Sequence, residues 1–251
     1  MTDWQTALFG FARADAGLIA ERSMQRRAES KFVVSSATAA AFISALQDRF
    51  AVLPAGAALV ADYRSLYFDT DDLAFFHAHR CGRRVRHKVR VRHYADRELS
   101  VLEVKSRRGE HHTVKSCRPR EYGTTGLGPD DLAYVREQCG RIGALLPQAW
   151  VAYRRVTLVG LTSPERVTLD LNLDMWRASG HEQLDRAVII EVKQPRLDHH
   201  SDAMRALRAA GSRPAWMSKY CTAIVLTSPG VRANHLLNRI RHLTTVGTWT
   251  H

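Results

Sequence analysis

Basic side chains alternate with other residues along one stretch of the chain, from Arg83 to Tyr94. The basic positions are Arg84, Arg86, Lys88, Arg90 and Arg92. The positions between them are mainly valine, and a period of two predicts a β-strand with one cationic and one largely apolar face. Such a row can bind successive phosphate oxygens, because arginine offers planar two-point contacts and lysine supplies compact charge. A solvated strand face would show the same pattern, so this stretch alone does not decide between the two interpretations.

Carboxylates take some of the polar positions in other alternating stretches of the chain. Glu103 and Lys105 are two residues apart, so they have the same parity and lie on one face of a strand, as do Glu191 and Lys193. Hard oxygen ligands of this kind suit Mg²⁺ or Mn²⁺, which are often bound partly through substrate phosphates. We therefore predict a divalent-cation site whose ligands are Glu191, Glu103, Glu29 and Asp170. Each Glu-x-Lys pair taken alone is also compatible with a structural ion pair.

Eight alternating stretches must position these side chains. They cover residues 29–34, 62–68, 83–94, 99–107, 113–115, 151–159, 166–174 and 187–193. Their polar parities are too charged to form a packed core, whereas they would line a water-filled lumen well. The sequence predicts an α+β fold, in which an eight-stranded antiparallel β-barrel forms a tunnel with a charged lumen and is wrapped by helices.

The length of 251 residues fits one domain that contains a single core. We divide it into an N-terminal helix in residues 1–24, barrel strands with inserted helices in 25–195, and C-terminal helices in 196–251. The inserted helices are expected at 39–50, capped by Ser36 or Thr38, at a short segment ending near Phe76, and at 131–146.

The charge and cysteine content narrow the class of protein. Lysine and arginine number 37 against 25 aspartates and glutamates, giving a formal net charge of +12. This surplus favours a polyanionic partner: nucleic acid, an anionic membrane, or a phosphate-rich molecule. The four cysteines form no Cys-x-x-Cys pair, which argues against zinc and disulfides and favours a reducing, cytoplasmic compartment. The chain lacks a secretory signal and any apolar run of about 18 residues, so we expect a soluble protein without a transmembrane segment.

Several short motifs follow one another along the chain: Arg27-Ala-Glu29-Ser-Lys31-Phe32, Ser65-Leu-Tyr-Phe-Asp69-Thr70, Arg90-Val-Arg92-His-Tyr94, Leu102-Glu103-Val-Lys105, Tyr153-Arg-Arg155, Val167-Thr-Leu-Asp170, Ile190-Glu191-Val-Lys193 and Ser218-Lys219-Tyr220. In this order they resemble the VTC domain, which is the polyphosphate polymerase branch of the triphosphate tunnel metalloenzymes. The resemblance implies an eight-stranded tunnel that transfers the γ-phosphate of ATP to a polyphosphate chain and releases ADP, with Mn²⁺ or Mg²⁺.

The resemblance also implies roles for individual residues. The catalytic, phosphate-binding set is Arg90, Arg92, Lys31, Lys105, Arg155 and Lys193. Further substrate contacts are assigned to Lys115, Lys219, Ser218, Arg86, Lys88 and Tyr153. The resemblance makes Glu191 the leading metal ligand. We choose Arg155 over Arg154 because Arg155 shares its parity with Tyr153.

Two alternative functions remain open from the sequence. The related cyclase and thiamine-triphosphatase branch begins with Glu-x-Glu-x-Lys, whereas Arg27 stands at the first of these positions, which favours the polymerase branch. A triphosphatase or cyclase is the alternative within the fold. The other alternative is a polyphosphate- or nucleic-acid-binding module without turnover, although the basic strand lacks the interleaved aromatics typical of single-strand binding. The expected partners are therefore ATP and polyphosphate rather than nucleic acid, and a membrane-protein partner would place the protein at the inner face of the membrane.

Overall fold

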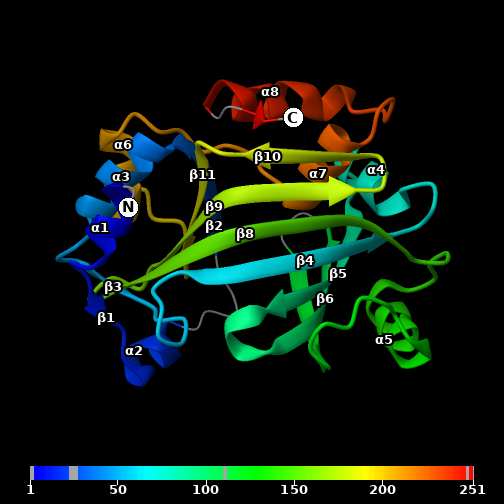
Figure 1. Ribbon diagram of the computed structural model, residues 1–251, viewed down its shortest axis with the longest axis horizontal. Coiled ribbons are helices and arrows are strands. Elements are labelled where there is room, and N and C mark those ends of the chain that lie inside the picture. The colour runs from blue at the N-terminus through cyan, green and yellow to red at the C-terminus, as the bar shows by residue number, and fades with distance from the viewer. Residues whose placement is uncertain (1–2, 23–27, 110–111, 247–248, 251) are drawn as a thin grey trace.

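The computed structural model describes residues 3–22, 28–109, 112–246 and 249–250 (Figure 1). Its centre is a mostly antiparallel sheet in which eight long strands pair one after another. In spatial order these are β2 (Ala28–Ser35), β11 (Ala187–Gln194), β9 (Arg166–Arg177), β8 (Leu146–Gly160), β4 (Ala61–Asp69), β5 (Val85–Tyr94), β6 (Leu99–Arg108) and β7 (His112–Arg120). All eight predicted strands are present, and the α+β class is confirmed. The stretch expected to be shortest, 113–115, belongs to the nine-residue strand β7.

Four shorter strands extend this sheet and were not predicted. They are β1 (Ala12–Arg13), β3 (Phe50–Val52), β10 (Gly180–Leu184) and β12 (Trp249–Thr250). Strands of two or three residues are too short to show a period of two, and β10 follows β9 through a tight hairpin. They lengthen the sheet but supply no side chain to the site described below.

The expected closure of the barrel is not found among the described residues. Strands β2 and β7 are the first and the last of the eight long strands, and no backbone pairing joins them. The physical reason lies in the segment before α7 (Lys219–Thr227), where the N–H of Ala215 donates to the carbonyl oxygen of Lys31 at 2.7 Å. A hydrogen bond to this segment occupies an edge position of β2 that closure would require, and covering an edge in this way also protects it. The sheet is therefore an open one.

Two apolar cores cover the outer face of the sheet. One lies under α1 (Asp3–Leu8), α3 (Ser36–Ser44) and α6 (Asp202–Ala209), which Figure 1 shows grouped at one end of the strands. The other lies under α5 (Pro129–Cys139) and includes Val135 and Leu102. Two valines of the basic strand, Val89 and Val91, are fully buried in this second core, as the alternation predicts, whereas Val85 at the start of the strand is 56% exposed.

A third core fills part of the inner face. Helix α7 packs there against β4, β8 and β9, together with α8 (Asn234–Val246) and α4 (Ala74–Arg80). The ring of Tyr220 is buried and stacks on Tyr67, with ring centroids 5.1 Å apart. Its hydroxyl donates to Asp69, which also accepts from the N–H groups of Phe75 and Phe76 at the start of α4. One buried carboxylate thus joins the first turns of two helices.

A bulge in β9 changes which of its side chains face each side of the sheet. The register with β8 shifts between Ala152 and Arg154, and Asn172 adopts a left-handed backbone with φ of 50°. One extra residue reverses the direction of every later side chain. Leu173 therefore packs on the α7 side, while Leu171 packs on the opposite face, although the alternation had put both leucines on one side.

The predicted helices needed changes at their ends. The single N-terminal helix is instead α1, β1 and a separate helix α2 (Ala16–Glu21), which Asp15 caps by accepting from the N–H of Leu18 at 2.8 Å. Ser35, rather than Ser36 or Thr38, caps α3. Helix α3 ends at Ser44 rather than Phe50, and α5 ends at Cys139 because β8 already begins at Leu146.

Candidate functional site

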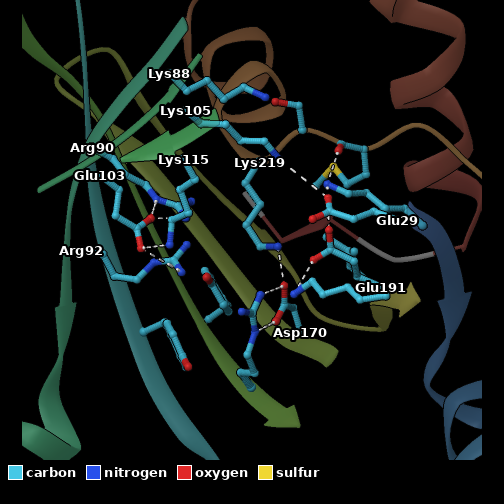
Figure 2. Close-up of a pocket in the computed structure, with 18 of the residues that line it drawn as sticks. Glu29, Lys88, Arg90, Arg92, Glu103, Lys105, Lys115, Asp170, Glu191 and Lys219 are labelled. Carbon is cyan, nitrogen blue, oxygen red and sulfur yellow. Dashed lines mark hydrogen bonds and ion pairs between the residues drawn. The ribbon is translucent and has the colours of Figure 1, made fainter. Parts of the chain in front are cut away.

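The inner face of the sheet encloses a cavity of about 360 Å³ beside the first turn of α7 (Figure 2). Each of the eight long strands contributes at least one side chain to its lining. The alternation explains this convergence, because every second residue of a strand points to the same face. Figure 2 shows cationic and carboxylate side chains of opposite walls pointing toward one another across the space.

The lining is strongly cationic. It contains eleven basic side chains, from Arg22, Lys31, Lys88, Arg90, Arg92, Lys105, Lys115, Arg155, Arg166, Lys193 and Lys219. It contains four carboxylates, from Glu29, Glu103, Asp170 and Glu191. The surplus of positive charge inside a low-dielectric wall focuses an electric field that attracts anions.

Glu103 is the centre of the first ion-pair cluster. Its carboxylate accepts from Arg90 Nε at 2.6 Å and from Lys115 Nζ at 2.7 Å, and Arg92 lies 3.9 Å away. Burial by itself would raise the pKa of Glu103, but Arg90, Arg92 and Lys115 hold it well below the usual range. The carboxylate is therefore ionised and fixes three cations from two strands.

Asp170 is the centre of the second cluster. Arg155 donates to both of its oxygens, from Nε to Oδ1 at 2.5 Å and from Nη2 to Oδ2 at 2.8 Å. Lys219 Nζ also donates to Oδ2. Burial opposes ionisation of Asp170, yet Arg155 and Lys219 lower its pKa below the ordinary value. The two-point contact fixes the plane of the Arg155 guanidinium.

Glu191 forms a looser third cluster. Its two oxygens lie 3.6 Å from Lys31 Nζ and 3.4 Å from Lys193 Nζ, and its side chain also hydrogen-bonds to that of Glu29. Burial raises the pKa of Glu191, whereas the two lysines and the Glu29 contact lower it, with the net effect downward. Glu29 in turn lies 3.7 Å from Lys105. Among the described residues, the ion pairs of Glu191 are with lysines.

Tyrosines support several of these cations from beneath. Arg92 and Arg155, from strands on either side of β4, both lie over the ring of Tyr63, at 5.3 and 4.9 Å from its centroid. Lys219 lies 4.6 Å from the ring of Tyr153, and the hydroxyl of Tyr67 accepts from Arg90 at 2.8 Å. Cation–π contacts hold a charge in place without neutralising it.

Lys88 has a different environment. None of the ion pairs within the described part of the chain includes it. Burial, together with Lys31, Lys105 and Arg90, lowers the pKa of Lys88 to about 7. An incoming anion would stabilise the charged form of this lysine.

The structure brings nearly all the predicted site residues together. The cavity lining includes all six residues of the predicted catalytic set, all four predicted metal ligands, and Lys88, Lys115, Tyr153, Ser218 and Lys219. Arg86 does not line it and instead borders a neighbouring hollow of about 500 Å³, which also includes Lys105 and Arg107. Arg155 points into the cavity, whereas Arg154 pairs with Asp62 at 3.8 Å on the other face. Arg27, which distinguished the two branches, lies outside the described residues.

Several lining residues were not predicted from the sequence. Tyr63, Tyr67 and Tyr94 lie on the inner parity of β4 and β5, and Arg166 shares the parity of Asp170 on β9, so the alternation could have identified all four. Arg22 had no comparable signal. Arg22 follows α2 and reaches the site from the N-terminal segment, with its Nε donating to the carbonyl of Gly160 at 3.1 Å.

The four carboxylates are not equally suited to a metal ion. The described residues contain no group of three or more His, Cys, Asp or Glu side chains that could hold one. Glu103 and Asp170 already accept from short guanidinium and ammonium contacts. Glu29 and Glu191 adjoin each other on neighbouring strands, and their contacts with lysine are longer. This pair fits a divalent cation that completes its coordination with substrate phosphates and water.

Comparison with solved structures shows the same fold in cyclase-like proteins. A Bacillus halodurans protein assigned as an adenylate cyclase aligns with a TM-score of 0.52 and 14% identity, over 77% of this chain and 94% of that one. A Hippeastrum protein assigned as an adenylyl cyclase, for which a dominant triphosphatase activity is described, aligns with a TM-score of 0.51 and 16% identity, over 81% of this chain and 98% of that one. A search of curated proteins gives no significant match.

The VTC domain model matches residues 26–123 and 133–227. The chain therefore belongs to the VTC domain family, as its motifs had indicated. No helix of the described residues is both long and apolar enough to cross a membrane.

Proposed function

We propose that this protein is an ATP-dependent polyphosphate polymerase, which transfers the γ-phosphate of ATP to the end of a polyphosphate chain and releases ADP. The observation that carries the proposal is the composition of the cavity, where eleven basic side chains face four carboxylates. A polyanion without a large apolar part is the ligand that such a lining favours. Membership of the VTC domain family supports the same conclusion.

The cations hold the triphosphate by contacts from several walls. Arg90 and Arg92 on β5, Lys31 on β2 and Lys193 on β11 bind phosphate oxygens from opposite sides. Lys105, Lys115, Arg155 and Lys219 extend this set, with Lys88 and Ser218 beside them and Tyr153 beneath Lys219. Because Glu103 and Asp170 fix several of these groups before the substrate arrives, little reorganisation is needed on binding.

The transfer step needs no covalent intermediate on the enzyme. An oxygen of the terminal phosphate of the polymer attacks the γ-phosphorus of ATP, and the bond from that phosphorus to the β,γ-bridging oxygen breaks. The polymer gains one phosphate and ADP leaves with the bridging oxygen. The arginines and lysines neutralise the charge that builds on the transferred group and on the leaving group.

Glu29 and Glu191 are the residues that would hold Mn²⁺ or Mg²⁺. A bound divalent ion supplies charge neutralisation and fixes the geometry of the phosphates. Glu103 and Asp170 act in this proposal through the cations that they hold.

Triphosphate hydrolysis is the second candidate function. It is favoured by the triphosphatase activity described for the Hippeastrum neighbour. The two functions differ only in the acceptor, which is water in one case and polyphosphate in the other. The polymerase function would place the protein with ATP in the cytoplasm, where a membrane protein could receive the polymer.

Incubation of the purified protein with ATP and Mn²⁺ tests the proposal. We expect a polyphosphate ladder on a stained gel with a matching amount of ADP. Glu191→Gln and Arg90→Ala should both lose the ladder, whereas Arg136→Ala, an exposed arginine of α5, should keep it. Free phosphate without polymer would support the hydrolase, and tight retention of added polyphosphate without turnover of ATP would support a binding module.

A further inference from the structure

A second hollow, of about 610 Å³, lies on the opposite face of the strands that enclose the cationic cavity. Its lining comes from β4, β5, β8, β9 and β10 and from residues 122–125. Figure 1 shows that no helix crosses the middle of β4, β8 and β9 on the side toward the viewer. We call this hollow the outer groove, and the proposed phosphate chemistry makes no use of it.

Arg64 is the central feature of the outer groove. Trp150 and Trp176 stack on each other with ring centroids 5.8 Å apart and an interplanar angle of 9°. The guanidinium carbon of Arg64 lies 4.7 Å from the centroid of Trp150 and 5.1 Å from that of Trp176. Two indoles therefore hold an exposed guanidinium in place through cation–π contacts.

The N–H groups of this guanidinium are available to a ligand. Among the described residues, the side chain of Arg64 has ring contacts but neither a hydrogen bond nor an ion pair. A guanidinium presents its donors in a planar fork that matches the two oxygens of a carboxylate. Because the indoles already restrict its motion, less conformational entropy is lost when a ligand binds.

The two carboxylates of the outer groove already have other partners. Asp62 pairs with Arg154 at 3.8 Å, and Asp174 lies 2.5 Å from His181 Nε2. Arg64 is therefore the cation for which the described lining of this groove supplies no anion.

His93 adds a buried donor beside Arg64. It is 6% exposed, stacks on Trp150 at 5.7 Å, and its Nε2 has no partner among the described residues. Ser100 Oγ accepts from the N–H of Gly123 at 3.1 Å and lies 2.6 Å from His93 Nδ1. Donation of the Ser100 proton to Nδ1 leaves the histidine proton on Nε2. Since burial and Arg64 lower the pKa of His93, the ring is neutral and contributes a hydrogen bond rather than charge.

The aromatic lining indicates what accompanies the anion. Tyr122 is 45% exposed and meets His93 edge to face, with ring centroids 6.1 Å apart. Tryptophan, tyrosine and arginine are the residues that most often dominate protein–protein contacts. An occupant that combines one carboxylate with an apolar neighbour would use both the Arg64 fork and the aromatic surface.

We propose that the outer groove binds a peptide segment of a partner protein through an aspartate or glutamate seated on Arg64, with an adjacent apolar side chain against Tyr122 and the tryptophans. The cavity on the inner face shows how this protein surrounds phosphates, with many convergent lysines and arginines. The lining of the outer groove holds two arginines, two aspartates and no lysine, and Arg64 has no ion pair among the described residues, which favours a single carboxylate over a polyphosphate. This site is independent of the function proposed above.

Nuclear magnetic resonance of the tryptophan indole N–H groups tests the proposal in the full chain. Saturating tripolyphosphate is added first, so that the cationic cavity is filled. The probes are the peptides N-acetyl-Leu-Glu-Leu-amide and N-acetyl-Leu-Gln-Leu-amide, titrated to about 10 mM, the range of weak single-site affinities. We expect the first peptide to shift the Trp150 and Trp176 signals and to leave the buried Trp4 signal in place.

Variants make the assignment specific. Arg64→Gln should weaken binding at least tenfold, because it removes a charge-assisted two-point contact. Arg64→Lys, which keeps the charge and loses the fork, should also weaken it. An unchanged Trp4 signal in each variant excludes misfolding. The proposal is overturned if the Trp150 and Trp176 signals do not move, if the glutamine peptide binds equally well, or if tripolyphosphate itself shifts these signals in an Arg64-dependent way, since the groove would then be a phosphate site.

Discussion

Lys105 on β6 lies 3.7 Å from Glu29 on β2, across the gap where the sheet leaves its two edge strands unpaired. Side chains therefore complete a wall that backbone hydrogen bonds do not. The contact also ties Glu29, one of the two carboxylates that fit a divalent ion, to the opposite side of the cavity. The ligand affinity and the stability of the site should therefore depend more on contacts between side chains than on the pairing of the strands.

Tyr63 should determine how well two arginines are positioned. Replacing Tyr63 with leucine removes the ring beneath Arg92 and Arg155, so we expect tripolyphosphate affinity to fall about tenfold. Tyr63→Phe keeps the ring and should bind nearly as well as the unmodified protein. Isothermal titration calorimetry measures both affinities, and equal losses in the two variants would show that the hydroxyl matters rather than the ring.

Asp170 should be important for stability when no substrate is bound. Asp170→Asn leaves Arg155 and Lys219 buried without their counter-ion, which should lower the free energy of unfolding by about 3–5 kcal/mol. Tripolyphosphate should restore part of this loss, because its oxygens supply the missing negative charge. Urea unfolding with and without tripolyphosphate checks both expectations, and a variant as stable as the parent would contradict them.

The same carboxylate predicts a direction for acid sensitivity. Because the folded pKa of Asp170 is depressed, its contribution is fully present above the unfolded value near 4 and is lost as the pH falls through the folded pKa. Unfolding free energies measured from neutral pH down to strongly acidic pH should fall less steeply in Asp170→Asn than in the parent. Parallel curves for the two proteins would contradict this assignment.

Lys88 should take up a proton when an anion binds. With a pKa lowered to about 7, it is mostly neutral at pH 8, and a bound polyanion would raise that pKa and favour the charged form. In the free protein, protonation of Lys88 opposes folding, so this penalty is full below pH 7 and is relieved as the pH rises from about 7 toward the unfolded value. Calorimetry at pH 8 in two buffers of different ionisation enthalpy should detect proton uptake that Lys88→Met lacks. Equal uptake in both proteins would assign the proton to another group.

Divalent-ion binding should separate the carboxylates into two classes. With tripolyphosphate present, Glu29→Gln and Glu191→Gln should weaken Mn²⁺ binding about tenfold or more, since each removes a hard oxygen ligand. Electron paramagnetic resonance of free Mn²⁺ gives the affinity directly. Glu103→Gln is the matched control, and it should alter Mn²⁺ affinity far less because Arg90 and Lys115 already occupy that carboxylate. If Glu103→Gln had the largest effect, the assignment of the metal to Glu29 and Glu191 would fail.

Regular alternation made most of the fold predictable. The strands that carry Arg90, Glu103 and Glu191 alternate around these residues, and side chains of one parity reach the same face without any long-range information. The choice of Arg155 over Arg154 followed from the same local rule, and the cavity indeed contains Arg155.

Features that depend on distant partners could not be predicted in this way. The bulge at Asn172 reverses the parity of β9 through one left-handed residue, which no periodic pattern reveals. The hydrogen bond from Ala215 to Lys31, which takes an edge position of β2, joins segments far apart in the sequence. Whether a carboxylate is held by arginine or left for a metal depends on distances across strands, so Glu103 and Glu191 look alike in the sequence and differ in the structure.

The unpaired edges of β2 and β7 change how a long polymer can reach the cavity. A closed barrel admits a chain only by threading one of its ends, because sideways passage would break a row of backbone hydrogen bonds. Here the seam is crossed by the contact between Lys105 and Glu29, a partly exposed ion pair that contributes about 0–1 kcal/mol, and by the segment whose Ala215 donates to Lys31. To enter sideways, the proposed polymer would have to displace this segment and the ion pair rather than a row of hydrogen bonds between strands.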